Sequence, residues 1–180
     1  MGHRIGSRYI EGLNHVGSGL ALSAEIDSAV RSARVFSELS AHEAGLLRGF
    51  LDVFRVQNGE SFIFEGDEGS FMVLVLTGQV NVFRQFNSAN PKLIAAVGPG
   101  KTLGEMSMID GEPRFATCVA AEDTTFAMLD RKAFREIVEK HPALASKILL
   151  HLVALLNQRL RQASTKLVEF MEAAEKAPRL

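Results

Sequence analysis

The sequence predicts an α+β protein in which an antiparallel, jelly-roll-like β-roll is flanked by N-terminal helices and a long C-terminal helix. Three observations carry this prediction. Short β-rich runs alternate with glycine turns from about residue 53 to residue 130. The residues before this region have apolar side chains at helical spacing. The residues after it have them too, in a stripe that continues for three heptads.

The composition is that of one ordinary folded domain. The 180 residues are 47% apolar with a formal net charge of −1, so no overall charge favours nucleic acid or an anionic membrane. Cys118 is the only cysteine, which excludes an intrachain disulfide and fits a reducing compartment. No apolar segment has the form of a signal peptide or the length of a membrane span. We therefore expect a cytoplasmic protein that does not insert into membranes.

The N-terminal region is predicted to be a tail followed by two helices. Glycines break any periodicity in residues 1–23, so we expect a flexible tail there and a single folded domain over residues 24–180. A helical pattern starts at Ala24. Ser40 and Glu43 have the spacing of a capping box, which predicts that a second helix begins at Ser40.

The middle of the chain is predicted to be a roll of short antiparallel strands. Turn residues separate its β-rich runs, and we interpret Gly66, Gly69 and Gly78 as backbone turns without chemistry. The expected strands include residues 61–64, 71–76, 93–97, 114–120 and 125–129, and residues 87–91 are expected to form an exposed hairpin loop.

Hinge and C-terminal helices are predicted over residues 131–172. A short helix covers 132–140, and a long helix follows from 142. The apolar stripe of the long helix is longer than one small roll can cover. We interpret its first turns as packed on the roll and its second half as paired with a partner helix, hence a homodimer. The stripe consists of Leu149, Leu152, Leu156, Leu160, Ala163, Leu167 and Phe170.

Glu105 and Arg114 form the most informative motif of the chain. Glu105 follows a glycine, and a Gly/Pro turn leads to Arg114 nine residues later. A guanidinium matches phosphate oxygens in bidentate fashion, and a carboxylate can accept a hydrogen bond from a ribose hydroxyl. A simple ion pair between the two residues is the alternative. The glycine turns around them favour a phosphate site, whereas residues 98–102 lack the spacing of a P-loop.

These features resemble the cyclic nucleotide-binding domain, the sensor shared by catabolite activator proteins, protein kinase A regulatory subunits and cyclic nucleotide-gated channels. The resemblance covers about residues 36–161. It rests on Phe64-Glu65-Gly66-Asp67, Gly104-Glu105-Met106 and Pro113-Arg114-Phe115-Ala116-Thr117. It implies that Glu105 binds the ribose 2′-hydroxyl and that Arg114 binds the cyclic phosphate. Backbone amides of residues 105–108 would add donors.

The base-binding side departs from the family pattern. Phe115 stands where the family has a small or hydroxylated residue, and where threonine is associated with cGMP, so the resemblance favours cAMP over cGMP. On the long helix, Arg159 and Ser164 are candidates for contacts with the base, and a solvated helix face is the alternative for each. The implied ligand-binding residues are Gly104, Glu105, Met106, Ser107, Arg114, Phe115, Ala116, Ile94, Arg159 and Ser164.

Two functional hypotheses follow. The first is a stand-alone cyclic nucleotide sensor without an output domain in this chain, in which ligand binding reorients the long helix and changes a dimer surface or an unidentified effector's surface. The second is a nucleotide-independent dimeric scaffold in which Phe115 fills the base pocket. We expect no enzyme, cofactor or metal, because the five histidines lie outside the expected roll. No basic stripe predicts binding to nucleic acid.

Overall fold

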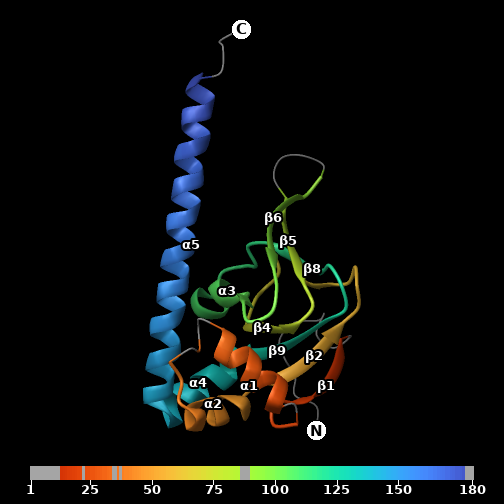
Figure 1. Ribbon diagram of the computed structural model, residues 1–180, viewed down its shortest axis with the longest axis vertical. Helices are drawn as coiled ribbons and strands as arrows, with labels where there is room; N and C mark the ends of the chain where they lie inside the picture. The colour runs from red at the N-terminus through yellow and green to blue at the C-terminus, as the bar shows by residue number, and fades with distance from the viewer. Residues whose placement is uncertain (1–12, 22, 34–35, 37, 86–89, 177–180) are drawn as a thin grey trace.

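The computed structural model describes residues 13–21, 23–33, 36, 38–85 and 90–176 (Figure 1). Within them, two antiparallel sheets have the strand orders β1-β2-β9-β4-β7 and β3-β8-β5-β6. The strands are β1 Asn14–Ser18, β2 Asp52–Val56, β3 Ser61–Ile63, β4 Phe71–Thr77, β5 Val80–Arg84, β6 Lys92–Val97, β7 Thr102–Leu103, β8 Thr117–Ala120 and β9 Thr124–Asp130. The helices are α1 Ser23–Ser32, α2 Ala41–Arg48, α3 Glu105–Asp110, α4 Arg131–Lys140 and α5 Pro142–Lys176. The predicted fold class is confirmed.

The five-stranded sheet is buried on both faces, which explains the uninterrupted apolar run of β4. Successive side chains of a strand point to opposite faces. In β4, Phe71, Val73 and Val75 lie in the cluster between the two sheets, and Met72, Leu74 and Leu76 lie in the cluster under the helices. The roll and the helical layer therefore have separate cores that share this sheet.

The helical layer covers the outer face of the five-stranded sheet. Ile26 and Val30 of α1, Leu47 of α2 and Ile137 of α4 are buried in one cluster with the first turns of α5. The predicted capping box is confirmed at the start of α2. The Ser40 hydroxyl accepts from the Glu43 amide, and the Glu43 carboxylate accepts from the Ser40 amide.

Helix α5 has two environments along a length of about 50 Å. Leu144, Ile148 and Leu152 are buried, which confirms that the first turns pack on the body of the protein. Every side chain described in residues 160–175, here called the far half, is exposed. Figure 1 shows this part of α5 standing apart from the roll. The partner helix expected for it stays a prediction.

Some expectations for the N-terminal region and the strands are wrong. The tail expected over residues 1–23 includes β1, which pairs with β2. An edge strand needs backbone partners on one side only, so no apolar pattern signals it. His15, expected outside the roll, lies in this strand. The strand expected at 114–120 begins at Thr117.

Other expectations are untested. Residues 1–12, and 87–89 of the expected hairpin loop, lie outside the described residues. None of the helices in the described ranges has both the length and the apolar character required to cross a bilayer.

Candidate functional site

Two glycines set the ends of α3, the short helix that begins at Glu105. Gly104 and Gly111 have φ values of 77° and 82°, in the left-handed region that other residues rarely adopt. Gly104 also approaches Arg114 closely, because a Cβ atom there would lie 2.6 Å from the Nη1 atom of Arg114. In Figure 1, α3 lies between the roll and α5. The glycine turns thus place Glu105 and Arg114 together.

Arg114 is buried and held rigidly by the backbone around it. Its side chain is 4% exposed, and its Nη1 atom donates to the carbonyl oxygens of Phe71 and Gly104, each at 2.9 Å. Its guanidinium carbon lies 4.2 Å from the centre of the Phe71 ring. The backbone of Arg114 is bonded on both sides, to Gly66 and Asp67. The side chain has one well-defined position.

One donor group of Arg114 is left without a partner. The Nη2 atom is buried and makes no hydrogen bond. Burial lowers the pKa of Arg114 to about 10, with the nearby Arg131 acting in the same direction and Glu105 opposing it. The guanidinium is therefore charged at neutral pH. A buried cation with an unused donor is a site for an anion.

Glu105 is also buried and also has an unused polar atom. It is 1% exposed, its Oε1 atom is paired with Arg159, and its Oε2 atom is buried without a hydrogen bond. Burial raises its pKa, an effect opposed first by the charge of Arg159 and then by its own backbone amide and the charge of Arg114. The simple Glu105–Arg114 ion pair considered from the sequence is replaced by a pair with Arg159.

Arg159 connects this site directly to α5. Its Nη1 atom donates to Glu105, and its Nη2 atom donates to the Thr102 carbonyl oxygen at 2.9 Å. Arg159 was expected from the resemblance as a contact to the base. In this structure Arg159 binds the Glu105 carboxylate and the backbone of β7, the strand that precedes α3. Glu105 is therefore connected to the long helix directly, through one side chain.

Sequence reasoning missed two residues that support α3. Gly69 was interpreted as a turn, but a Cβ atom there would lie 2.5 Å from the Nε atom of Arg114. Arg131, the first residue of α4, donates to the carbonyl oxygens of Met108 at 2.8 Å and of Ser107. No local pattern marks either residue, because both act on segments that are distant in sequence.

The other expected site residues fall into two groups. Ser107 and Ala116 are buried, and the Ser107 hydroxyl donates to the Pro113 carbonyl oxygen at 3.4 Å. The exposed group consists of Met106, Ile94, Phe115 and Ser164. The roles assigned to these residues in base binding stay predictions.

Phe115 has a partner that the sequence did not indicate. The guanidinium carbon of Arg84, at the end of β5, lies 3.7 Å from the centre of its ring, within the range of a cation–π interaction. Cys118, the only cysteine of the sequence, is buried, and burial raises its pKa to about 12, so its thiol stays neutral. Within the described residues, no group of three or more His, Cys, Asp or Glu side chains could hold a metal ion.

Comparison with known proteins is consistent with this geometry. The family described as "Cyclic nucleotide-binding domain" matches residues 53–141. A curated relative, the cyclic AMP receptor protein of Thermus thermophilus, is 32% identical over 80% of this chain and 66% of its own length. The chain thus spans about two thirds of that relative.

Two solved structures have the same architecture. A cyclic nucleotide-binding domain from Methylobacillus flagellatus has a TM-score of 0.83 and 31% identity, with 99% of each chain covered. The Thermus thermophilus catabolite activator protein has a TM-score of 0.70 and 30% identity, covering 77% of this chain and 63% of that chain.

Proposed function

We propose, since the chain belongs to the cyclic nucleotide-binding domain family, that it is a cytoplasmic sensor that binds cAMP in preference to cGMP. One observation carries the proposal. The Nη2 atom of Arg114 and the Oε2 atom of Glu105 are a buried donor and a buried acceptor, and neither has a partner. Leaving a buried polar group unsatisfied costs about 1–3 kcal/mol, and a ligand that binds both atoms would remove that cost.

A cyclic nucleotide satisfies both atoms at once. Its phosphate is an anion that accepts from the Arg114 Nη2 atom, and its ribose 2′-hydroxyl donates to the Glu105 Oε2 atom. Gly104 and Gly69 support this assignment, because any side chain at either position would clash with Arg114. The carbonyl oxygens of Phe71 and Gly104 hold the guanidinium before the ligand arrives, so little side-chain entropy is lost on binding.

The preference for cAMP rests on Phe115. Its side chain offers no hydrogen bond to guanine, and its ring is already in contact with Arg84. The Thermus relative is named a cyclic AMP receptor protein. We assign Ile94, Met106 and Ser164 to the surroundings of the base.

Signal transmission would use the Arg159 contact. A hydroxyl that binds Glu105 competes with or reinforces the Arg159 pair, and Arg159 belongs to α5. The resulting shift in the position of α5 would change the surface of its far half, where apolar residues lie exposed. We propose that this surface forms a homodimer and acts on a protein effector, with no direct role for nucleic acid, a metal or catalysis.

A nucleotide-independent scaffold is the second candidate. The exposed apolar stripe of α5 favours it, because a dimer through this stripe requires no ligand. A scaffold and a sensor differ in one measurable property. Only a ligand that binds the native state raises the melting temperature by mass action.

Calorimetric titration of the full chain with cAMP and cGMP tests the proposal. We expect saturable binding of cAMP, weaker binding of cGMP, and a loss of affinity of at least about 100-fold in Arg114→Ala, because a charge-assisted hydrogen bond is removed. Arg55→Ala, an exposed arginine of β2, is the matched control. Circular dichroism verifies that the Arg114→Ala variant is folded. Absence of binding, together with no shift in melting temperature, would favour the scaffold.

A further inference from the structure

A second cavity lies outside the Glu105–Arg114 site. It has a volume of about 620 Å³, a size typical of small-molecule sites. Its apolar lining comes from Phe64, Phe83, Pro91 and Val119, and its polar lining from Glu65, Gln85 and Thr117. None of these residues belongs to the site described above.

The strand register places this cavity on the outer face of the four-stranded sheet. Thr117 lies opposite Phe83 in the β5–β8 ladder, and directly opposed residues share a face. Val119 is two residues further along β8 and shares that face. Cys118 and Ala120 alternate with them and are buried between the sheets. The cavity therefore opens to solvent on the side of the sheet that faces away from the core.

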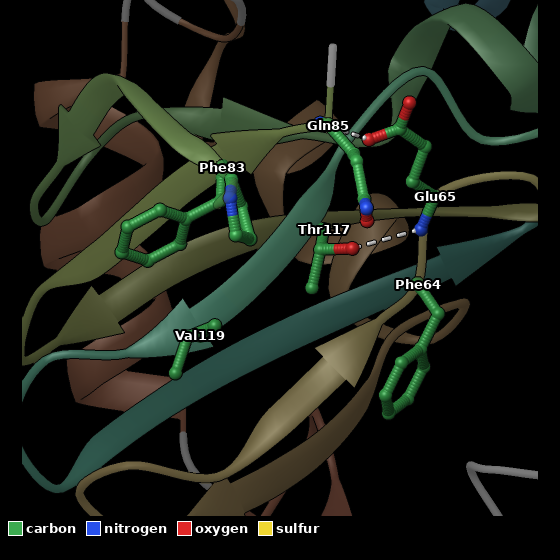
Figure 2. A pocket seen from close by; sticks show the side chains of 7 residues that line it. Phe64, Glu65, Phe83, Gln85, Thr117 and Val119 are labelled. Atoms are coloured by element: carbon green, nitrogen blue, oxygen red, sulfur yellow. Dashed lines mark hydrogen bonds between the residues drawn. The ribbon is translucent and has the colours of Figure 1, made fainter. Parts of the chain in front are cut away.

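The polar groups of the cavity gather at one end. In Figure 2, Glu65 and Gln85 lie on one side, Phe83 and Val119 on the other, and Thr117 between them. The Glu65 Oε2 atom accepts from the Gln85 amide at 2.8 Å, and the Glu65 amide donates to the Thr117 hydroxyl at 3.0 Å. The Oε1 atom of Glu65 is ion-paired with Arg84, at 3.9 Å from its Nε atom, a distance too long for a hydrogen bond.

We propose that this cavity binds a small aromatic molecule that carries an ammonium group. Phe64 and Phe83 offer ring faces and edges to an aromatic body. An ionised carboxylate has about four acceptor positions, so the Oε1 atom of Glu65 can accept from a ligand N–H group. This acceptor favours a ligand that donates N–H groups and disfavours a carboxylate of the same shape, which has no proton to donate to it.

The cavity is also linked to the site of the proposed function, on which this step rests. The two residues after Glu65 are hydrogen-bonded to the backbone of Arg114. The Gly66 amide donates to the Arg114 carbonyl oxygen at 2.9 Å, and the Arg114 amide donates to the Asp67 carbonyl oxygen at 2.8 Å. An occupant that moves Glu65 moves the backbone that holds Arg114. The two ligands then alter each other's affinity reciprocally.

Tryptamine is a suitable probe, with indole-3-propionate as an anionic control that has the same ring system. The chain has no tryptophan, so the indole fluorescence of the probe reports binding directly. We expect tryptamine to bind the full chain at least about tenfold more tightly than indole-3-propionate, and Glu65→Gln to remove that difference. Glu68→Gln, an exposed carboxylate in the same loop, is expected to behave as wild type.

Filling the cavity provides an independent test. Val119→Phe keeps a residue type that is favoured in strands and occupies the apolar end, so tryptamine binding is expected to fall at least about tenfold. Equal binding of the two indoles, no binding of tryptamine, or unchanged binding in folded Val119→Phe overturns the proposed cavity site.

The link to the nucleotide site is measured separately. Titrations of cAMP with and without saturating tryptamine are expected to differ in affinity by at least about threefold. Equal affinities overturn the link between the two sites. A wild-type protein that binds tryptamine but no cyclic nucleotide overturns the proposed function and leaves the cavity site standing.

Discussion

The inner end of the roll and the far half of α5 depart from the usual rule of burial in opposite directions. At the end of the roll, two charged residues lie almost completely inside, with Glu105 1% and Arg114 4% exposed. In the far half of α5, Leu160, Leu167 and Phe170 are more than half exposed, at 64%, 59% and 73%. The first region buries charged groups that are normally solvated, and the second exposes apolar side chains that are normally buried.

The difference supports a different proposed contact for each region. Buried polar groups and large exposed apolar patches are the informative exceptions in a folded chain. The charged residues are rigidly held and each has one atom without a partner, as expected for a small polar ligand. The apolar residues of α5 recur along one helix, as expected for another helix. The proposed ligand site and the proposed dimer surface are thus opposite exceptions to the same rule of burial.

Placing charges on the apolar stripe of α5 should disrupt the dimer proposed for its far half. Leu160→Glu combined with Leu167→Glu would bury four carboxylates in a symmetric dimer, so we expect its dissociation constant to rise at least about 100-fold. Sedimentation velocity over a concentration series measures this. Thr165→Glu, on the opposite face of the same helix, is the control and is expected to leave the dimer intact. A double variant that remains dimeric would rule out this interface.

Two neighbouring leucines of α5 test whether burial, rather than residue type, determines stability. Leu152 is 0% exposed and Leu150 is 70% exposed. Leu152→Ala is expected to lower the free energy of unfolding by about 2–4 kcal/mol, and Leu150→Ala to change it by less than about 0.5 kcal/mol. Urea unfolding of both variants gives the two values. Similar losses in both would contradict the assignment of a packed face and an exposed face.

The buried carboxylate should reveal itself in the pH dependence of stability. Because the pKa of Glu105 is raised in the folded state, its contribution to the free energy of unfolding is present at low pH. That contribution is lost as the pH rises through the folded pKa. Without nucleotide, the wild type is expected to lose stability relative to Glu105→Gln over that rise. Denaturant unfolding of both proteins between about pH 4 and pH 8 measures the difference. A difference that stays constant with pH would contradict a raised pKa.

A partly buried ion pair at the surface, between Glu43 and Lys147, is expected to give the smallest effect, with the opposite sign. Lys147 and the start of α2 lower the pKa of Glu43 to about 2. The contribution of Glu43 to the free energy of unfolding is therefore present above its unfolded pKa and declines as the pH falls towards 2. Glu43→Gln should remove this decline without altering the behaviour of Glu105. Acid unfolding curves of the two proteins test it, and identical curves would mean that the pair adds nothing.

Much of the fold follows from local patterns in the sequence. The apolar spacing of residues 132–140 and beyond, and the alternation of β-rich runs with glycine turns, predict the helices and most strands with small errors at their ends. The capping box at Ser40 is confirmed because it depends on two residues three positions apart. Strand β1 escapes prediction because its pairing with β2 joins residues far apart, and the glycines around it hide any period.

The site divides in the same way. The types and spacing of Glu105 and Arg114 suffice to predict phosphate and ribose chemistry. Gly69 could not be distinguished from a turn residue. The reason that no side chain fits at this position is its contact with Arg114, which lies far along the chain. Arg84 and Phe115 likewise meet only when β5 and the segment before β8 come together.

The sequence by itself determined most of the elements, their order and the two charged residues proposed to bind the ligand, since each depends on side chains close together along the chain. Only the tertiary structure decided which polar atoms remain without partners, and that Glu105 is paired with Arg159, 54 residues away on α5. It also decided where along α5 the buried part of the stripe ends. These properties depend on packing between distant segments, which sets the surroundings of each side chain and leaves no periodic trace in the sequence.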